Sequence, residues 1–221
     1  MSRMIRLANG LRLLRRLRRD ADGVALIEMA FVAPFLMVLA LGGIELISYS
    51  TAHMRVSQVA ISLADNASRA KQEIVSGVPR MREVDVNEAF RAAELQAGAL
   101  DIADNGLLIL SSLETNADDG QWIHWQRCHG GADYASSYGE EGDGETGTAF
   151  PGMGPADKRV LAEEGYAIMF VEVYYDYTPM VFGRLLPDRP IRKTAAMYVR
   201  DDRDLSGIYN PAPQSDVRTC D

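Results

Sequence analysis

The chain has 221 residues, of which 47% are hydrophobic, and its formal net charge is −8 at pH 7. This length accommodates one domain with an additional segment, and this hydrophobic content excludes wholesale disorder. The acidic balance argues against a nucleic-acid partner, because binding to phosphates needs a basic face.

Charge is distributed unevenly along the chain. Residues 1–23 contain seven arginines against two aspartates, whereas residues 51–221 contain 16 Lys and Arg against 27 Asp and Glu. Positively charged flanks of a membrane span stay in the cytoplasm. We therefore expect residues 1–23 to be a basic cytoplasmic leader and residues 24–50 to cross the inner membrane once. Residues 51–221 would then form the periplasmic or extracellular domain.

The segment from Gly23 to Tyr49, GVALIEMAFVAPFLMVLALGGIELISY, is apolar enough to cross a bilayer. From Val24 onward it would measure about 39 Å as a helix, more than the roughly 30 Å of hydrocarbon. Glu28 would lie about 6 Å into this segment, whereas Glu45, about 31 Å along, could reach the opposite headgroups. A lone ionised carboxylate within a span costs about 2.5–3.5 kcal/mol, so Glu28 needs a compensating partner.

Three interpretations of this segment compete. A cleaved secretory signal would end near residues 40–43, but Glu28 and Pro34 interrupt its apolar region. A plain signal anchor would carry Glu28 incidentally. A prepilin-type segment would be cut after Gly23, and the new α-amine of Val24 would be positively charged at neutral pH. That amine could pair with Glu28 of a neighbouring subunit, so this interpretation alone accounts for the leader, the glycine and the acid.

These residues resemble the N-terminal signature of TadE-like pseudopilins of the tight-adherence (Tad, Flp-type) pilus. In that family a glycine precedes an apolar stretch and a glutamate, with a proline six residues beyond the glutamate. Here these positions are Gly23, Glu28 and Pro34. Met29 departs from the pattern, since major pilins of such systems carry tyrosine there. A looser similarity includes the segment 172–182.

The resemblance implies a minor pseudopilin that a Tad-type prepilin peptidase processes between Gly23 and Val24. It would act in pilus assembly or at the pilus tip, with other pseudopilins and pilins as partners. It implies no cofactor and no enzymatic activity. The alternative is a membrane-anchored periplasmic domain that binds a ligand or acts as an adhesin.

Pro34 has no N–H to bond the carbonyl of Ala30, so we expect a local kink in the helix. Membrane helices also tolerate proline without a special role. The bend could therefore serve assembly or be incidental.

The helix is predicted to continue beyond the span, because apolar residues recur at helical spacing from Val56 to Ala70. Residues 76–79, Ser-Gly-Val-Pro, should end it. A second helix should start at a capping-box pattern formed by Asp85 and Glu88 and run to about Leu100.

Strand patterns follow. Residues 106–113 and 121–128 predict a hairpin, in which Trp122, His124, Gln126 and Cys128 would share one face. Further strands are expected at 167–177 and 191–200, with a short helix at 180–186 and an irregular tail. The tyrosines at 174, 175 and 177 could be adhesive, but packing on a sheet is the favoured interpretation. The expected fold is pilin-like α+β, a long N-terminal helix packed on a small, mostly antiparallel sheet of about four strands.

Cys128 and Cys220 are the two cysteines of the chain. In an exported domain they predict one disulfide, which would tie down the C-terminal tail. Two free buried thiols are the alternative.

Residues 129–158 form a long acidic loop rich in glycine. Its carboxylates could bind Ca²⁺, and the weak candidate ligands are Glu140, Glu141, Asp143 and Glu145. A solvated loop is the default interpretation. His124 and Cys128 supply too few ligands for a structural zinc site, so no metal is assigned. No phosphate-binding loop or catalytic motif is present in the sequence, and none of its residues is assigned a catalytic role.

Overall fold

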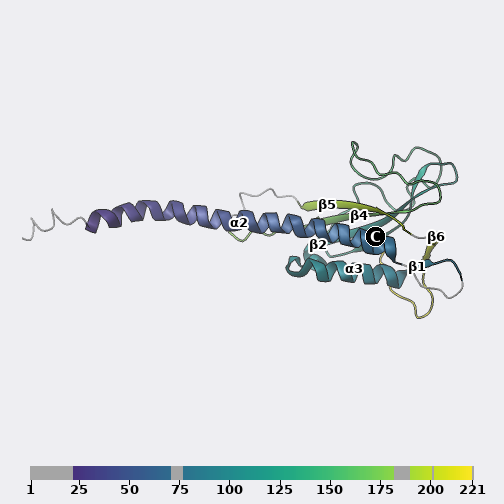
Figure 1. Cartoon of the computed structure of the whole chain (residues 1–221), viewed down its shortest axis with the longest axis horizontal. Coiled ribbons are helices and arrows are strands. Elements are labelled where there is room, and N and C mark those ends of the chain that lie inside the picture. Colours follow the sequence, from purple (N-terminus) through teal and green to yellow (C-terminus); the bar gives the residue numbers. More distant parts are fainter. Residues whose placement is uncertain (1–21, 71–76, 182–189, 201, 221) are drawn as a thin grey trace, which may run out of the picture. The chain divides into compact units, whose positions relative to one another are not determined.

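The structure is a computed structural model that describes residues 22–70, 77–181, 190–200 and 202–220 (Figure 1). Most of the basic leader, residues 1–21, lies outside the described residues. The helix predicted at 180–186 also falls largely outside them, and its first two residues are not helical. The elements in chain order are α2 (Asp22–Arg69), β1 (Arg80–Arg82), α3 (Glu83–Ala97), η1 (Gly98–Leu100), α4 (Ile102–Asn105), β2 (Gly106–Thr115), β3 (Gln121–His129), β4 (Ile168–Tyr175), β5 (Ile191–Tyr198) and β6 (Asp204–Tyr209).

Four strands form an antiparallel sheet in the order β3-β2-β4-β5. This sheet and the long helix α2 confirm the predicted α+β class. The structure adds a small sheet in which β1 and β6 pair in parallel. The tail was expected to be irregular, and that prediction is wrong for β6.

The chain divides into two compact units. One contains the chain up to Ile47 together with Met180 and Val181. The other contains most of the chain from Ser48 onward, including the sheet and α3. The helix α2 contributes to both units.

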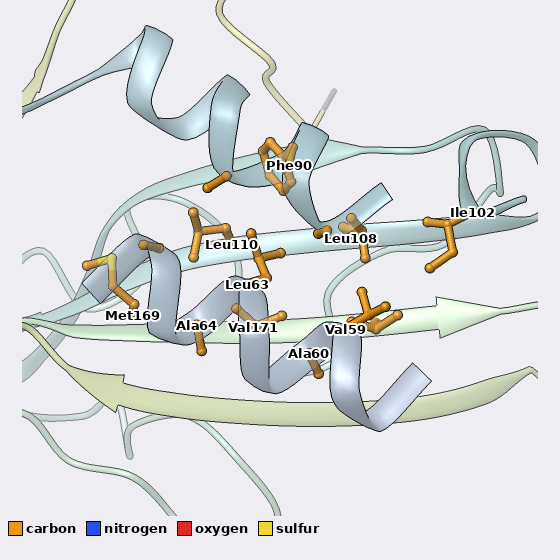
Figure 2. Close-up of a cluster of buried hydrophobic side chains, with 14 of the residues drawn as sticks. Val59, Ala60, Leu63, Ala64, Phe90, Ile102, Leu108, Leu110, Met169 and Val171 are labelled. Carbon is orange, nitrogen blue, oxygen red and sulfur yellow. The ribbon is translucent and has the colours of Figure 1, made fainter. Parts of the chain in front are cut away.

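The main core of the larger unit lies between the helices and one face of the sheet (Figure 2). The α2 stripe of Val59, Leu63 and Ala67 is fully buried, as the helical spacing predicted. Phe90 of α3 packs into the same cluster. The sheet contributes alternating residues that point to this face, namely Leu108, Leu110, Met169, Val171 and Val173.

The C-terminal end of α2 is capped by a residue that is distant in sequence. It ends at Arg69, earlier than the predicted stop at 76–79. The buried guanidinium of Arg203 donates hydrogen bonds to the carbonyls of Ala67 (3.2 Å) and Ser68 (2.7 Å). The last carbonyls of a helix have no partner within it, and a cation there also complements the helix dipole. Arg203 therefore satisfies this helix end.

Helix α3 starts two residues before the predicted capping position. The backbone N–H of Arg82 donates to the carboxylate of Asp85 at 3.0 Å, and the Arg82 side chain pairs with the same carboxylate. Asp85 is thus the third residue of the helix and not its N-cap. The sequence pattern located the start of this helix but misassigned the position of Asp85 within it.

A buried ion pair joins α3 to the sheet. The guanidinium of Arg127 on β3 donates to the carboxylate of Glu83 at 2.8 Å, and both side chains are almost fully buried. Arg127 also contacts Glu141 at 2.9 Å, but the Glu141 side chain is half exposed. Glu83 is therefore the main buried counter-charge of Arg127.

Replacing Glu83 with alanine should lower the free energy of unfolding by about 3 kcal/mol, because it leaves a buried guanidinium without its main partner. Urea unfolding of the protein measures this loss. Glu88→Ala, an exposed change on the same helix, is the control and should cost less than about 0.5 kcal/mol. Equal costs for the two variants would show that the buried pair has no special contribution.

Candidate functional site

The first half of α2 presents an apolar surface that is largely exposed among the residues that the structure describes. The helix contains an 18-residue window with a mean hydropathy of 2.4, and none of that window is buried. Leu26, Phe35 and Leu39 are each more than two-thirds exposed. A continuous apolar surface of this size is unusual for a soluble monomer and indicates contact with lipid or with other subunits. By length and composition this helix could cross a membrane.

Gly23 and Val24, the predicted processing site, lie in the first turn of α2. A Cβ added at Gly23 would meet no heavy atom within 4 Å. Glycine in a helix costs about 0.5–1 kcal/mol relative to alanine. Packing against the described residues therefore gives no reason for a glycine at this position.

Glu28 and Pro34 lie on the exposed part of α2. Glu28 forms no hydrogen bond or ion pair with any residue that the structure describes. Its predicted partner, the amine of a neighbouring subunit, thus remains a prediction. The helix is assigned continuously through Pro34, and the kink also remains a prediction.

Glu45 is a functional candidate whose partners the sequence did not reveal. Its side chain is only 3% exposed. Its carboxylate accepts hydrogen bonds from the backbone N–H groups of Met180 (3.0 Å) and Val181 (2.8 Å). The sequence singled out Glu28 as the unusual acid, and no sequence signal identified a partner of Glu45 so far along the chain. The expectation that Glu45 reaches the headgroups stays a prediction.

The second face of the sheet is covered by the long loop after β3. Met153, Tyr138 and Phe150 of this loop pack on sheet residues such as Phe170. The fully buried carboxylate of Glu172 accepts hydrogen bonds from loop and strand groups on Ser136, Ser137 and Tyr174. Parts of the loop therefore pack on the sheet, whereas its acidic stretch, residues 140–145, is mostly exposed, as the default interpretation of a solvated loop expected.

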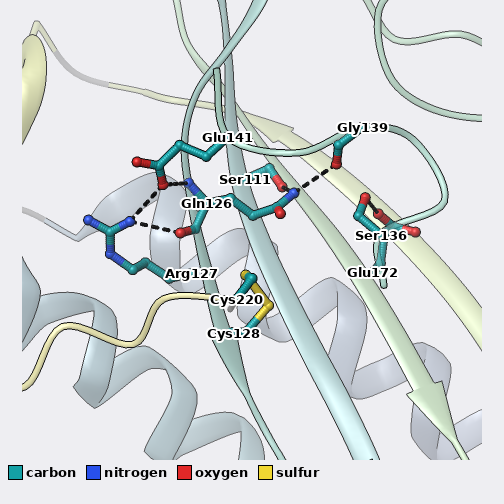
Figure 3. Close-up of a disulfide and its surroundings, with 9 residues drawn as sticks. All are labelled: Ser111, Gln126, Arg127, Cys128, Ser136, Gly139, Glu141, Glu172 and Cys220. Atoms are coloured by element: carbon teal, nitrogen blue, oxygen red, sulfur yellow. Dashed lines mark hydrogen bonds and ion pairs between the residues drawn. A yellow bond between two sulfur atoms is a disulfide. The ribbon is translucent and has the colours of Figure 1, made fainter. Parts of the chain in front are cut away.

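Cys128 and Cys220 form the predicted disulfide, with their Cα atoms 4.9 Å apart (Figure 3). The backbone N–H of Cys128 also donates to the carbonyl of Arg218 at 2.9 Å. The tail is thereby held along the outer edge of β3. Beside the disulfide lies a cavity of about 470 Å³, whose lining includes Tyr134, Glu140 and Glu141.

The four calcium candidates have separate environments. Glu141 accepts hydrogen bonds from the Gln126 backbone and from Arg127 (Figure 3). Asp143 accepts one from the backbone N–H of Glu140, and Glu145 is exposed. Among the described residues, no three His, Cys, Asp or Glu side chains are grouped as a metal site. The arrangement instead assigns Glu141 to holding the loop against β3.

The prediction of which β3 side chains share one face of the sheet is wrong for part of the strand. A β-bulge shifts the register, so that Ile123 pairs with Leu113 and Trp125 pairs with Ser112. Ile123 and Trp125 consequently belong to clusters on opposite faces of the sheet. A bulge inserts one unpaired residue and is not visible in an alternating pattern. It places His124 beside Trp122, at a ring-centroid distance of 4.1 Å, and not on the face of Cys128.

The histidines of the sheet have opposite pKa shifts. A hydrogen bond to the carboxylate of Glu114, at 3.0 Å, raises the pKa of His124. Burial, followed by the nearby charge of Arg218, lowers the pKa of His129. Both histidines serve as structural contacts between segments, and neither is arranged with a nucleophile.

The described residues define an α+β domain joined to one apolar helix that is long enough to cross a membrane. Residues 23–65 match the family model of TadE-like proteins. This match confirms the resemblance inferred from Gly23, Glu28 and Pro34, and it extends into the buried half of α2. No curated protein and no solved structure matches the chain. The match suggests a Tad pilus-associated protein.

The two pKa shifts predict opposite pH dependences. Since the folded-state pKa of His124 is raised, its stabilising effect is complete below the unfolded value of 6.5 and is lost as the pH rises through the folded-state pKa. His124→Gln should therefore reduce the free energy of unfolding more at about pH 5.5 than at about pH 8.5. Urea titrations at the two pH values measure this difference.

NMR titration of the imidazole signals provides the direct control. His124 should titrate above 6.5 and His129 below it. The reverse order of the two pKa values would contradict the assigned contacts.

Proposed function

We propose that this protein is a minor pseudopilin of a Tad-type pilus, cleaved after Gly23 by a prepilin peptidase and anchored in the inner membrane. Its C-terminal domain would lie in the periplasm, and it would act in pilus assembly or at the pilus tip. The observation that carries the proposal is the uncovered apolar half of α2, which falls within the TadE-like match.

The open surroundings of Gly23 support processing at this position. Because an added side chain would meet none of the described residues, the glycine is better explained by recognition from outside. A peptidase that reads the leader and cuts before Val24 supplies such a reason. The arginines of the leader would hold the cut site at the cytoplasmic face.

Glu28 supports assembly through the cleaved end. It is exposed on α2 and has no partner among the described residues, although it lies in a segment suited to lipid. The α-amine that cleavage creates at Val24 is cationic at neutral pH. Pairing between this amine and Glu28 of a neighbouring subunit would offset the cost of a carboxylate in an apolar setting.

Cleavage can be tested by mass spectrometry of the protein from cells that contain the pilus system. The mature chain should begin at Val24, and Gly23→Trp should leave the leader attached because the peptidase cannot accept the bulky side chain. Gly43→Trp is the matched control, since Gly43 is another helical glycine with open surroundings. A mature N-terminus elsewhere, or normal cleavage of Gly23→Trp, would contradict the proposal.

Assembly can be tested separately with Glu28→Gln. This variant should be cleaved normally, because the change lies beyond the cut site. Its recovery with other pilus components should fall at least about tenfold, since the loss of a buried charge pair exceeds 1.4 kcal/mol. Undiminished recovery of cleaved Glu28→Gln would show that the charge pair is not required.

One observation favours a second candidate, a membrane-anchored domain that binds a ligand. The cavity beside the disulfide is large enough for a small molecule and is bordered by the acidic loop. Cross-linking in intact cells separates the two functions. Products with pilus components support the pseudopilin, whereas products with a soluble ligand alone support the binding domain.

A further inference from the structure

We propose that Met180 and Val181, in the connection between β4 and β5, make a second contact with the membrane at its outward-facing interface. Glu45 would act as the positioning residue that holds this connection against α2. The inference rests on the proposed function, because it requires α2 to cross the membrane. Lipid is the occupant that the proposal assigns to this surface.

The contact between the two segments is well defined. One carboxylate oxygen of Glu45 accepts hydrogen bonds from the N–H groups of Met180 and Val181. Met180 and Val181 group with the chain up to Ile47 and not with the sheet that flanks them in sequence. Hydrogen bonds to an ionised acceptor are stronger than neutral ones. Met180 and Val181 are thus held to the helix through their backbone N–H groups.

This arrangement directs two apolar side chains outward. Met180 is 72% exposed and Val181 is 43% exposed. The side chain of Glu45, which bonds their backbone, is buried. Ile44, Leu46 and Ile47 on the same stretch of α2 are also exposed. The apolar surface of the span therefore continues onto the connection. Exposure of such a surface to water is unfavourable.

The depth of Glu45 places this surface at the interface. Glu45 lies about 31 Å along the helix from Val24, which is close to the roughly 30 Å thickness of the hydrocarbon core. A carboxylate at that level needs donors if water is excluded. The two backbone N–H groups supply them, and the side chains that follow are those that partition into lipid. The same contact therefore provides hydrogen-bond donors to Glu45 and brings the side chains of Met180 and Val181 to the membrane.

Spin labels at single introduced cysteines test the proposal in the full chain. The native cysteines are both in the disulfide, so the label reacts only at the introduced thiol. The protein is placed in vesicles of phosphatidylethanolamine and phosphatidylglycerol, and the collision rates with oxygen and with a water-soluble nickel chelate are compared. Met180→Cys should give an oxygen-to-nickel ratio several times higher than Val217→Cys, an exposed position in the C-terminal tail.

Leu36→Cys, within the span, reports on the anchor itself. If its label is in lipid while the label at Met180→Cys matches Val217→Cys, the inference is overturned and the proposed anchor stands. If the label at Leu36→Cys is in water, the proposed membrane anchor fails.

Glu45→Ala tests the positioning role. In this background the ratio at Met180→Cys should fall toward that of Val217→Cys, with the ratio at Leu36→Cys unchanged. Glu45→Gln keeps a carbonyl acceptor and should give an intermediate value. An unchanged ratio at Met180→Cys in Glu45→Ala would show that Glu45 does not hold the connection at the membrane.

Discussion

The structure depends on one helix that meets two different requirements along its length. From Ala52 onward, α2 has an apolar stripe that the sheet and α3 bury, with polar residues on its other side. Before Ile47 the helix is mostly apolar, and the described residues leave most of its side chains exposed. A helix that is apolar on all sides is stable only in lipid or among other apolar helices. The domain therefore packs on the second half of a helix whose first half needs lipid or other apolar helices around it.

Buried charges connect segments that are distant in sequence. Arg203 caps the end of α2, Arg127 joins the sheet to α3, and Glu172 holds the long loop to the sheet. Glu45 does the same for the connection between β4 and β5. Each of these side chains satisfies backbone groups or a counter-charge that would otherwise be unpaired. Because an unpaired buried charge is costly, such contacts specify which segments meet more strictly than apolar packing does.

Periodicity explains how much of this fold was predictable. The α2 stripe and the alternation along β2 and β4 are local patterns, and they identified both helices, the hairpin and the sheet. The bulge at His124, the pairing of β1 with β6 and the capping of α2 by Arg203 depend on contacts between distant segments. The disulfide was predictable because the chain has two cysteines, which allow one intramolecular pairing, in a domain expected to be exported. Glu28 was recognised by its spacing from Gly23, whereas the role of Glu45 required its partners to be seen.

The two glutamates of the apolar segment differ in whether their carboxylates have partners among the described residues. Glu45 finds its donors within the same molecule, and its burial makes it part of the fold. Glu28 finds none among the described residues. If the chain is cleaved after Gly23 as proposed, the new α-amine of a neighbouring subunit would be a suitable partner for this carboxylate. Glu45 would then stay bound within its own chain, while Glu28 would be satisfied by assembly.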